Sequence, residues 1–169
     1  MIRLLFIILF LSVSLVSGVH AQKNTTVNRR IREAYKAVRT ASGQENAERV
    51  LRDSLALPTT TDKIKAEGYH VCALLQQSMN DGLNMQAYLK QNLDTVRLYK
   101  TVLNIYGYTL NSDSVDEKRK YYSKNIKLRD LHRKNLLGGG KFLLRKSQWT
   151  EAYPFFDMFL KTCTTDMDS

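Results

Sequence analysis

Apolar residues recur at helical spacing along most of the chain, and this pattern constrains the fold more than any other feature. Between Val27 and Val38, for example, the apolar positions fall three or four residues apart, which places them on one face of an α-helix. No run alternates apolar and polar residues for long enough to predict a strand. The sequence therefore predicts an all-α fold.

Interruptions of this pattern divide the chain into about six helices. Because the connections are short, we expect three stacked antiparallel helix hairpins. Ser42-Gly43 and the Pro58 region should separate the first three helices, and Asn80-Asp81-Gly82 predicts a turn before a long fourth helix. That fourth helix should contain Leu89 and close near 111–113. A basic segment, 117–134, should then lead into the last two helices, expected at 135–146 and 150–161.

The first 21 residues have the layout of a secretory signal peptide. Arg3 supplies a positive charge, residues 4–16 are almost wholly apolar but too few to span a bilayer, and Val19-His20-Ala21 ends in small residues. We expect cleavage before Gln22 and export to the periplasm or the medium, with residues 22–169 forming one helical domain. An uncleaved membrane anchor is the alternative.

The chain is strongly basic, with 26 Lys and Arg against 16 Asp and Glu and a formal net charge of +10. Such a charge favours acidic partners. An exported protein seldom meets nucleic acid, so anionic glycans and lipid headgroups are the better candidates.

The last expected hairpin carries small and large residues at a characteristic spacing. Small residues let two helices cross closely, and large ones fill the space beside the crossing. Six positions fit this pattern: Leu136, Gly140, Leu143, Trp149, Ala152 and Phe156. On these positions residues 135–163 resemble one tetratricopeptide repeat, a helix–turn–helix unit of about 34 residues. The resemblance implies a solenoid that binds a protein or peptide on the groove formed by the first helices of its hairpins.

Other segments extend this resemblance. Ala47 and Ala87 follow expected turns, as the small residue of a second helix does, and residues 87–96 and 138–160 resemble exported, mostly uncharacterised repeat proteins of the Bacteroidota. Three short segments are similar to the O-glycosylation signal of that group: 53–55, 94–96 and 113–115. We expect Asp113-Ser114 to lie in a turn, and the sequence leaves open whether any of the three is used.

No arrangement of residues predicts catalysis. Gly138 to Lys141 is similar to part of a phosphate-binding loop, but Asn135 and Phe142 occupy positions where that loop needs Gly and Ser or Thr. His70 and His132 lack acidic or cysteine partners at helical spacing, so they make no zinc site. We therefore expect a protein that is not an enzyme and holds no metal or cofactor.

The densest positive charge lies between residues 118 and 134. Eight side chains contribute: Lys118, Arg119, Lys120, Lys124, Lys127, Arg129, Arg133 and Lys134. One interpretation is an anion-binding surface in which Tyr121 and Tyr122 stack beside cations. The other is a solvated helix face on which Tyr121, Leu128 and Leu131 pack against the core. A basic adaptor for anionic glycan or lipid headgroups is therefore the alternative to a peptide-binding scaffold.

The last expected helix is apolar on more faces than one neighbouring helix can cover. We expect part of this surface, with Phe155 and Phe159 as partner contacts, to be covered by a second copy of the chain or by another protein. Export would also permit a disulfide between Cys72 and Cys163, although Cys72 lies in an apolar helical run typical of a small buried residue.

Overall fold

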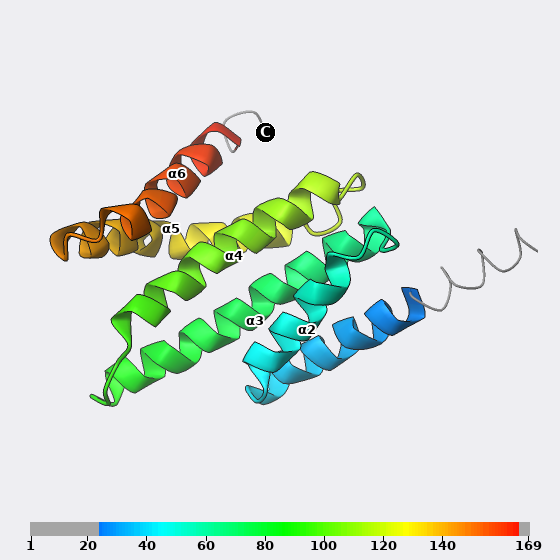
Figure 1. Ribbon diagram of the computed structural model, residues 1–169, viewed down its shortest axis with the longest axis horizontal. Helices are drawn as coiled ribbons and strands as arrows, with labels where there is room; N and C mark the ends of the chain where they lie inside the picture. The colour runs from blue at the N-terminus through cyan, green and yellow to red at the C-terminus, as the bar shows by residue number, and fades with distance from the viewer. Residues whose placement is uncertain (1–23, 166–169) are drawn as a thin grey trace, which may run out of the picture.

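The computed structural model describes residues 24–165, and every regular element in that range is an α-helix (Figure 1). The all-α prediction is therefore confirmed for this part of the chain. The expected signal peptide and its cleavage site lie outside the described residues. The six helices are 24–40, α2 (Gln44–Leu55), α3 (Asp62–Tyr88), α4 (Thr95–Val115), α5 (Tyr122–Arg145) and α6 (Trp149–Thr165).

Each helix from α2 onward packs against the next one along the chain. The long helices α3 and α4 lie side by side at the centre, with α2 and the helix of residues 24–40 on one side and α6 at the opposite edge (Figure 1). None of the described helices is long and apolar enough to cross a membrane.

Two apolar clusters hold the helices together. The first joins the helix of residues 24–40 to α2 and α3, and it includes Val27, Ile31, Leu51 and Leu75. The second joins α4, α5 and α6. Full burial of one such side chain contributes about 1.5–3 kcal/mol, so these clusters supply the main driving force for the fold.

Local chemistry explains the first helix boundaries. Gly43 adopts a left-handed conformation with φ of 66°, which glycine tolerates, and this permits the chain reversal between the first two helices. Asp94 caps α4, because its Oδ1 accepts a hydrogen bond from the backbone N–H of Arg97 at 2.9 Å. The expected breaks at Ser42-Gly43 and at Pro58 are confirmed.

The turn expected at Asn80-Asp81-Gly82 is not formed, because α3 continues through it to Tyr88. Asn80 is buried against α4, where its Nδ2 donates to the Thr101 hydroxyl at 2.8 Å. This tertiary bond uses the side chain that would otherwise support a turn. The actual break lies near Lys90, which has φ of 55°, so Leu89 and Ala87 belong to the end of α3 rather than to a following helix.

The basic segment 117–134 is also largely helical, since α5 begins at Tyr122. Asp113 and Ser114 lie in the last turn of α4, not in a turn between helices. The connection to α5 is closed by Asp116, whose Oδ2 accepts a hydrogen bond from the backbone N–H of Tyr121 at 2.7 Å.

The hairpin of α5 and α6 contains the residues that resemble a tetratricopeptide repeat. Leu136, Leu143 and Ala152 are buried, and Gly140 lies directly against the ring of Phe156. Trp149 does not fill the space beside the crossing: it is the first residue of α6 and is 68% exposed.

Phe155, expected at a partner interface, is buried in the core against Gly139. Phe159 is half-buried, whereas Tyr153 and Leu160 on the same helix are largely exposed. Both cysteines are free thiols, and the expected burial of Cys72 is confirmed. Burial also raises the pKa of the Cys72 thiol.

Candidate functional site

The helix of residues 24–40 and helices α3 and α5 together line a groove of about 460 Å³, here called the first-helix groove. These are the first helices of the three expected hairpins. The lining residues are Tyr35, His70, Leu74, Lys124, Lys127, Leu128 and Leu131. The groove therefore collects residues separated by almost a hundred positions in the sequence.

The floor of the groove is apolar and its rim is basic. Leu74 and Leu128 are half-buried, while Leu131 is 65% exposed and therefore does not pack into the core as expected. Lys124 and Lys127 are exposed three residues apart, on one face of α5. This face can meet a ligand that carries both apolar groups and negative charge.

The opposite face of the first half of α5 is buried and polar. Asn125, Arg129 and His132 are each at most 3% exposed. The guanidinium of Arg129 pairs with the carboxylate of Asp113 on α4 at 2.7 Å, and its backbone carbonyl accepts a hydrogen bond from the Tyr106 hydroxyl. Arg129 is therefore a structural residue and does not belong to an anion-binding surface.

A chain of hydrogen bonds links this buried face to the floor of the groove. Asn125 donates from Nδ2 to the carboxylate of Asp113 at 2.7 Å, and this orients its amide. Its Oδ1 then lies 2.7 Å from Nδ1 of His70, so Nδ1 must carry the proton. The neutral imidazole consequently presents Nε2 as a hydrogen-bond acceptor.

The charge state of His70 follows from its surroundings. Burial lowers its pKa. The hydrogen bond that His70 donates to Asn125 opposes this shift, Lys124 adds to it, and Asp113 and Glu67 oppose it. The net effect is a pKa below the ordinary value, so His70 is neutral near pH 7.

A second histidine that is hydrogen-bonded to a side-chain amide lies further along α3 and α5. Gln77 on α3 donates from Nε2 to Asp81 at 2.8 Å, and its Oε1 accepts from Nε2 of His132 on α5. Burial lowers the pKa of His132, while Asp81 partly opposes that shift. Neither arrangement was predicted from the sequence, although helical spacing places Asn125, Arg129, His132 and Leu136 on one face of α5.

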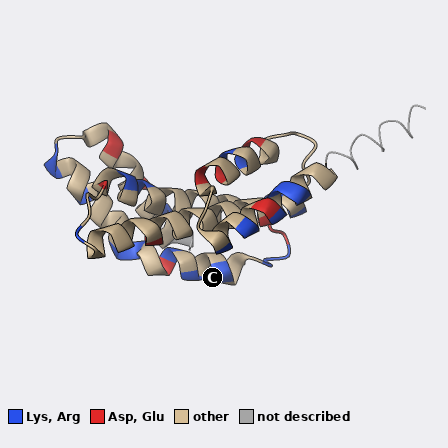
Figure 2. Cartoon of the chain, turned by 90° about the horizontal axis from the view of Figure 1, so that it is seen from below, with Lys and Arg blue, Asp and Glu red and all other residues tan. Residues whose placement is uncertain are grey.

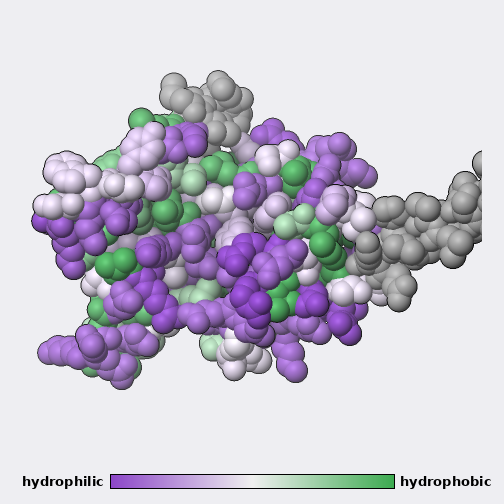
Figure 3. All heavy atoms as spheres, viewed as in Figure 1, coloured by the Kyte–Doolittle hydropathy of each residue, from purple (hydrophilic) through white to green (hydrophobic). Residues whose placement is uncertain are grey.

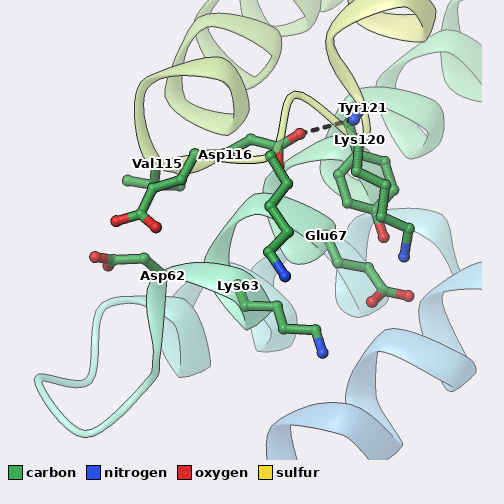
Figure 4. A pocket seen from close by; sticks show the side chains of 9 residues that line it. Asp62, Lys63, Glu67, Val115, Asp116, Lys120 and Tyr121 are labelled. Carbon is green, nitrogen blue, oxygen red and sulfur yellow. Dashed lines mark hydrogen bonds between the residues drawn. The ribbon is translucent and has the colours of Figure 1, made fainter.

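A second pocket of about 460 Å³ adjoins Tyr121, at the end of the α4–α5 connection (Figure 4). Its walls carry both signs of charge, including Glu67 and Lys63 on α3 and Lys120 beside Tyr121. The Tyr121 ring stacks on the His70 ring with centroids 4.9 Å apart, and Lys120 Nζ lies 4.8 Å from the Tyr121 centroid. Tyr121 is itself buried, so it contributes to the core as one interpretation predicted.

The remaining basic residues of segment 118–134 do not form one surface. Arg119 lies over the Tyr122 ring at 3.8 Å, and Arg133 pairs with Asp130. Lys118 lines the second pocket, whereas Lys134 is exposed outside both pockets. Figure 2 shows basic and acidic residues interspersed over several helices. Only Lys124 and Lys127 lie on the first-helix groove.

Within residues 24–165, no three His, Cys, Asp or Glu side chains gather as a metal site. The face seen in Figure 3 is largely hydrophilic, with apolar groups in separate places. No known protein family, curated protein or solved structure matches the chain.

Proposed function

We propose that this protein is an exported, non-enzymatic scaffold of the tetratricopeptide type, which binds an acidic and partly apolar segment of another protein in the first-helix groove. The observation that carries this proposal is the groove itself. It crosses the first helices of three successive hairpins, which is where such solenoids hold peptides, and it combines a leucine floor with a lysine rim.

Charge complementarity selects the kind of partner. Lys124 and Lys127 border the apolar floor, and the chain carries a net charge of +10. An acidic segment would be attracted over a distance of about 8 Å at physiological ionic strength, and its apolar side chains would then cover Leu128 and Leu131. Burial of these leucines would supply most of the affinity, because exposed ion pairs contribute little.

A matched pair of variants tests the groove. The probe is a fluorescein-labelled peptide of about 15 residues, composed of glutamate, leucine and glycine. Leu131→Asp should weaken its binding by about tenfold, as measured by fluorescence anisotropy. Leu160→Asp on α6 is the control, because Leu131 and Leu160 are equally exposed, each at 65%. Equal affinities of the two variants would refute the groove as the binding site.

The alternative is a basic adaptor that binds anionic glycan or lipid headgroups through residues 118–134. Two cations beside the Tyr121 ring favour this alternative. They are Lys120 and Lys124, whose Nζ atoms lie 4.8 and 6.0 Å from the ring centroid. A charge-driven adaptor should bind heparin or phosphatidylglycerol vesicles, lose that affinity steeply with added salt, and tolerate Leu131→Asp. A peptide-binding scaffold should instead prefer the peptide to heparin or vesicles, keep most of its affinity in added salt, and be weakened by Leu131→Asp.

Export is tested independently of binding. The N-terminal sequence of the protein recovered from its host should begin at Gln22. Recovery of intact Met1 in the cytoplasm would contradict the proposed export.

A further inference from the structure

His70 places an acceptor atom at the floor of the first-helix groove. It lines the groove while being only 4% exposed, and its Nδ1 is bonded to Asn125. Among residues 24–165, no hydrogen bond involves its Nε2. Although the imidazole as a whole is largely enclosed, Nε2 is not sealed from solvent, so water or a ligand can reach it and donate to it.

The neighbouring residues determine which ring nitrogen of His70 is the acceptor. Asp113 is acceptor-only as a carboxylate, so Asn125 must turn its amide nitrogen toward Asp113 and its oxygen toward His70. Nδ1 therefore holds the proton, and Nε2 accepts.

We propose that Nε2 of His70 is the specificity-determining acceptor of the groove and binds a backbone N–H of the acidic segment. The inference rests on the proposed function and names the chemistry by which the groove selects its ligand. Lys124 and Lys127 at the rim repel cationic donors and so favour an uncharged donor. An acidic, partly apolar segment carries its uncharged donors on its backbone, because the side chains of glutamate, aspartate and leucine have none at neutral pH.

Other groups near His70 are consistent with this arrangement. Tyr35 faces the groove from the helix of residues 24–40, and burial together with Glu67 raises its pKa, so it stays protonated. Lys124 from α5 disfavours a second positive charge on the ring. Tyr121 covers one face of the imidazole.

The tautomer can be tested without any ligand. Long-range ¹H–¹⁵N correlation spectra of the ¹⁵N-histidine-labelled protein at pH 7.5 (roughly one unit above the free imidazole pKa) should show His70 protonated at Nδ1 and not at Nε2. A resonance pattern with the proton on Nε2 would overturn the proposal.

Binding supplies the second test. The probe is the fluorescein-labelled peptide of glutamate, leucine and glycine, compared with the same peptide methylated at every backbone nitrogen. The wild-type protein should prefer the unmethylated peptide, and His70→Phe should reduce that preference by about three- to tenfold, the contribution of one hydrogen bond. Comparing the ratio in both proteins cancels the conformational effect of methylation on the free peptide.

The outcomes separate this proposal from the broader one. If the wild-type protein binds neither peptide, the proposed function itself fails. If it binds the peptide and His70→Phe keeps the full preference for the unmethylated form, the groove is the site but His70 does not select the ligand. Protonation of His70 would replace the acceptor by a donor, so wild-type affinity should fall as the pH drops below about 6.5, and His70→Phe should lack this fall. A stronger wild-type affinity at low pH would instead indicate a carboxylate bound at Nε2 and would overturn the proposal.

Discussion

Gly139→Ala should destabilise the protein, although the same substitution one residue earlier should stabilise it. Both glycines lie inside α5, where alanine is favoured over glycine by about 1 kcal/mol. At Gly138 a new Cβ would lie 3.6 Å from the Tyr99 ring, an ordinary contact. At Gly139 it would lie 2.6 Å from Cε1 of Phe155 and 3.0 Å from Cβ of Tyr99.

The clash at Gly139 is hard to relieve, because Phe155 is buried and a Cβ atom close to the backbone of α4 cannot move alone. Overpacking of this kind costs about 1–3 kcal/mol, which equals or exceeds the gain in helix propensity. Gly138→Ala should therefore raise the free energy of unfolding by about 1 kcal/mol, and Gly139→Ala should lower it by up to about 2 kcal/mol.

Urea unfolding followed by circular dichroism measures this difference. The two midpoints should differ by about 1 M, given a typical dependence of about 1–3 kcal/mol per molar urea. Gly107→Ala is the control for helix propensity alone, because nothing lies within 4 Å of its added Cβ. If Gly139→Ala is as stable as Gly138→Ala, the helices cross less closely than described and the reasoning is wrong.

Three further predictions concern the buried groups. Asp113→Ala should lower the free energy of unfolding by about 3–5 kcal/mol, because Arg129 would lose its buried counterion; an unchanged urea midpoint would contradict this. Stability should decrease as the pH falls below about 6.5, because folding lowers the pKa of His70 and His132 and the unfolded chain therefore takes up protons first. In the same pH titration the stability of His132→Gln should decrease less than that of the wild type. An equal decrease would show that His132 does not contribute to the pH dependence. Ala152→Leu should cost about 1–3 kcal/mol at the α5–α6 crossing, and a melting temperature equal to that of the wild type would show that Ala152 has room.

Helix class and the first boundaries could be predicted because they depend on local chemistry. The apolar spacing from Val27 to Val38 identifies the buried face of its helix whatever packs against it, and Gly43 permits a reversal by its own conformational freedom. The leucines of the last hairpin were placed correctly for the same reason.

The prediction at Asn80-Asp81-Gly82 was wrong because these residues favour turns only when their side chains are free to bond locally. The amide of Asn80 instead bonds to Thr101 across the α3–α4 interface, and the helix continues. Trp149 shows the opposite case: the resemblance to a tetratricopeptide repeat placed it beside the helix crossing, but its position at the start of α6 leaves it in solvent.

The sequence by itself determined that the chain is helical and which apolar faces are turned inward, because side-chain type and spacing fix both. Only the tertiary structure decided that polar residues of α5 are buried and that its lysines border a groove. The physical reason is distance along the chain: His70 meets Asn125, and Gln77 meets His132, each across 55 residues. Whether a buried polar group stabilises or destabilises the fold depends on that distant partner, and the local spacing of residues does not identify the partner.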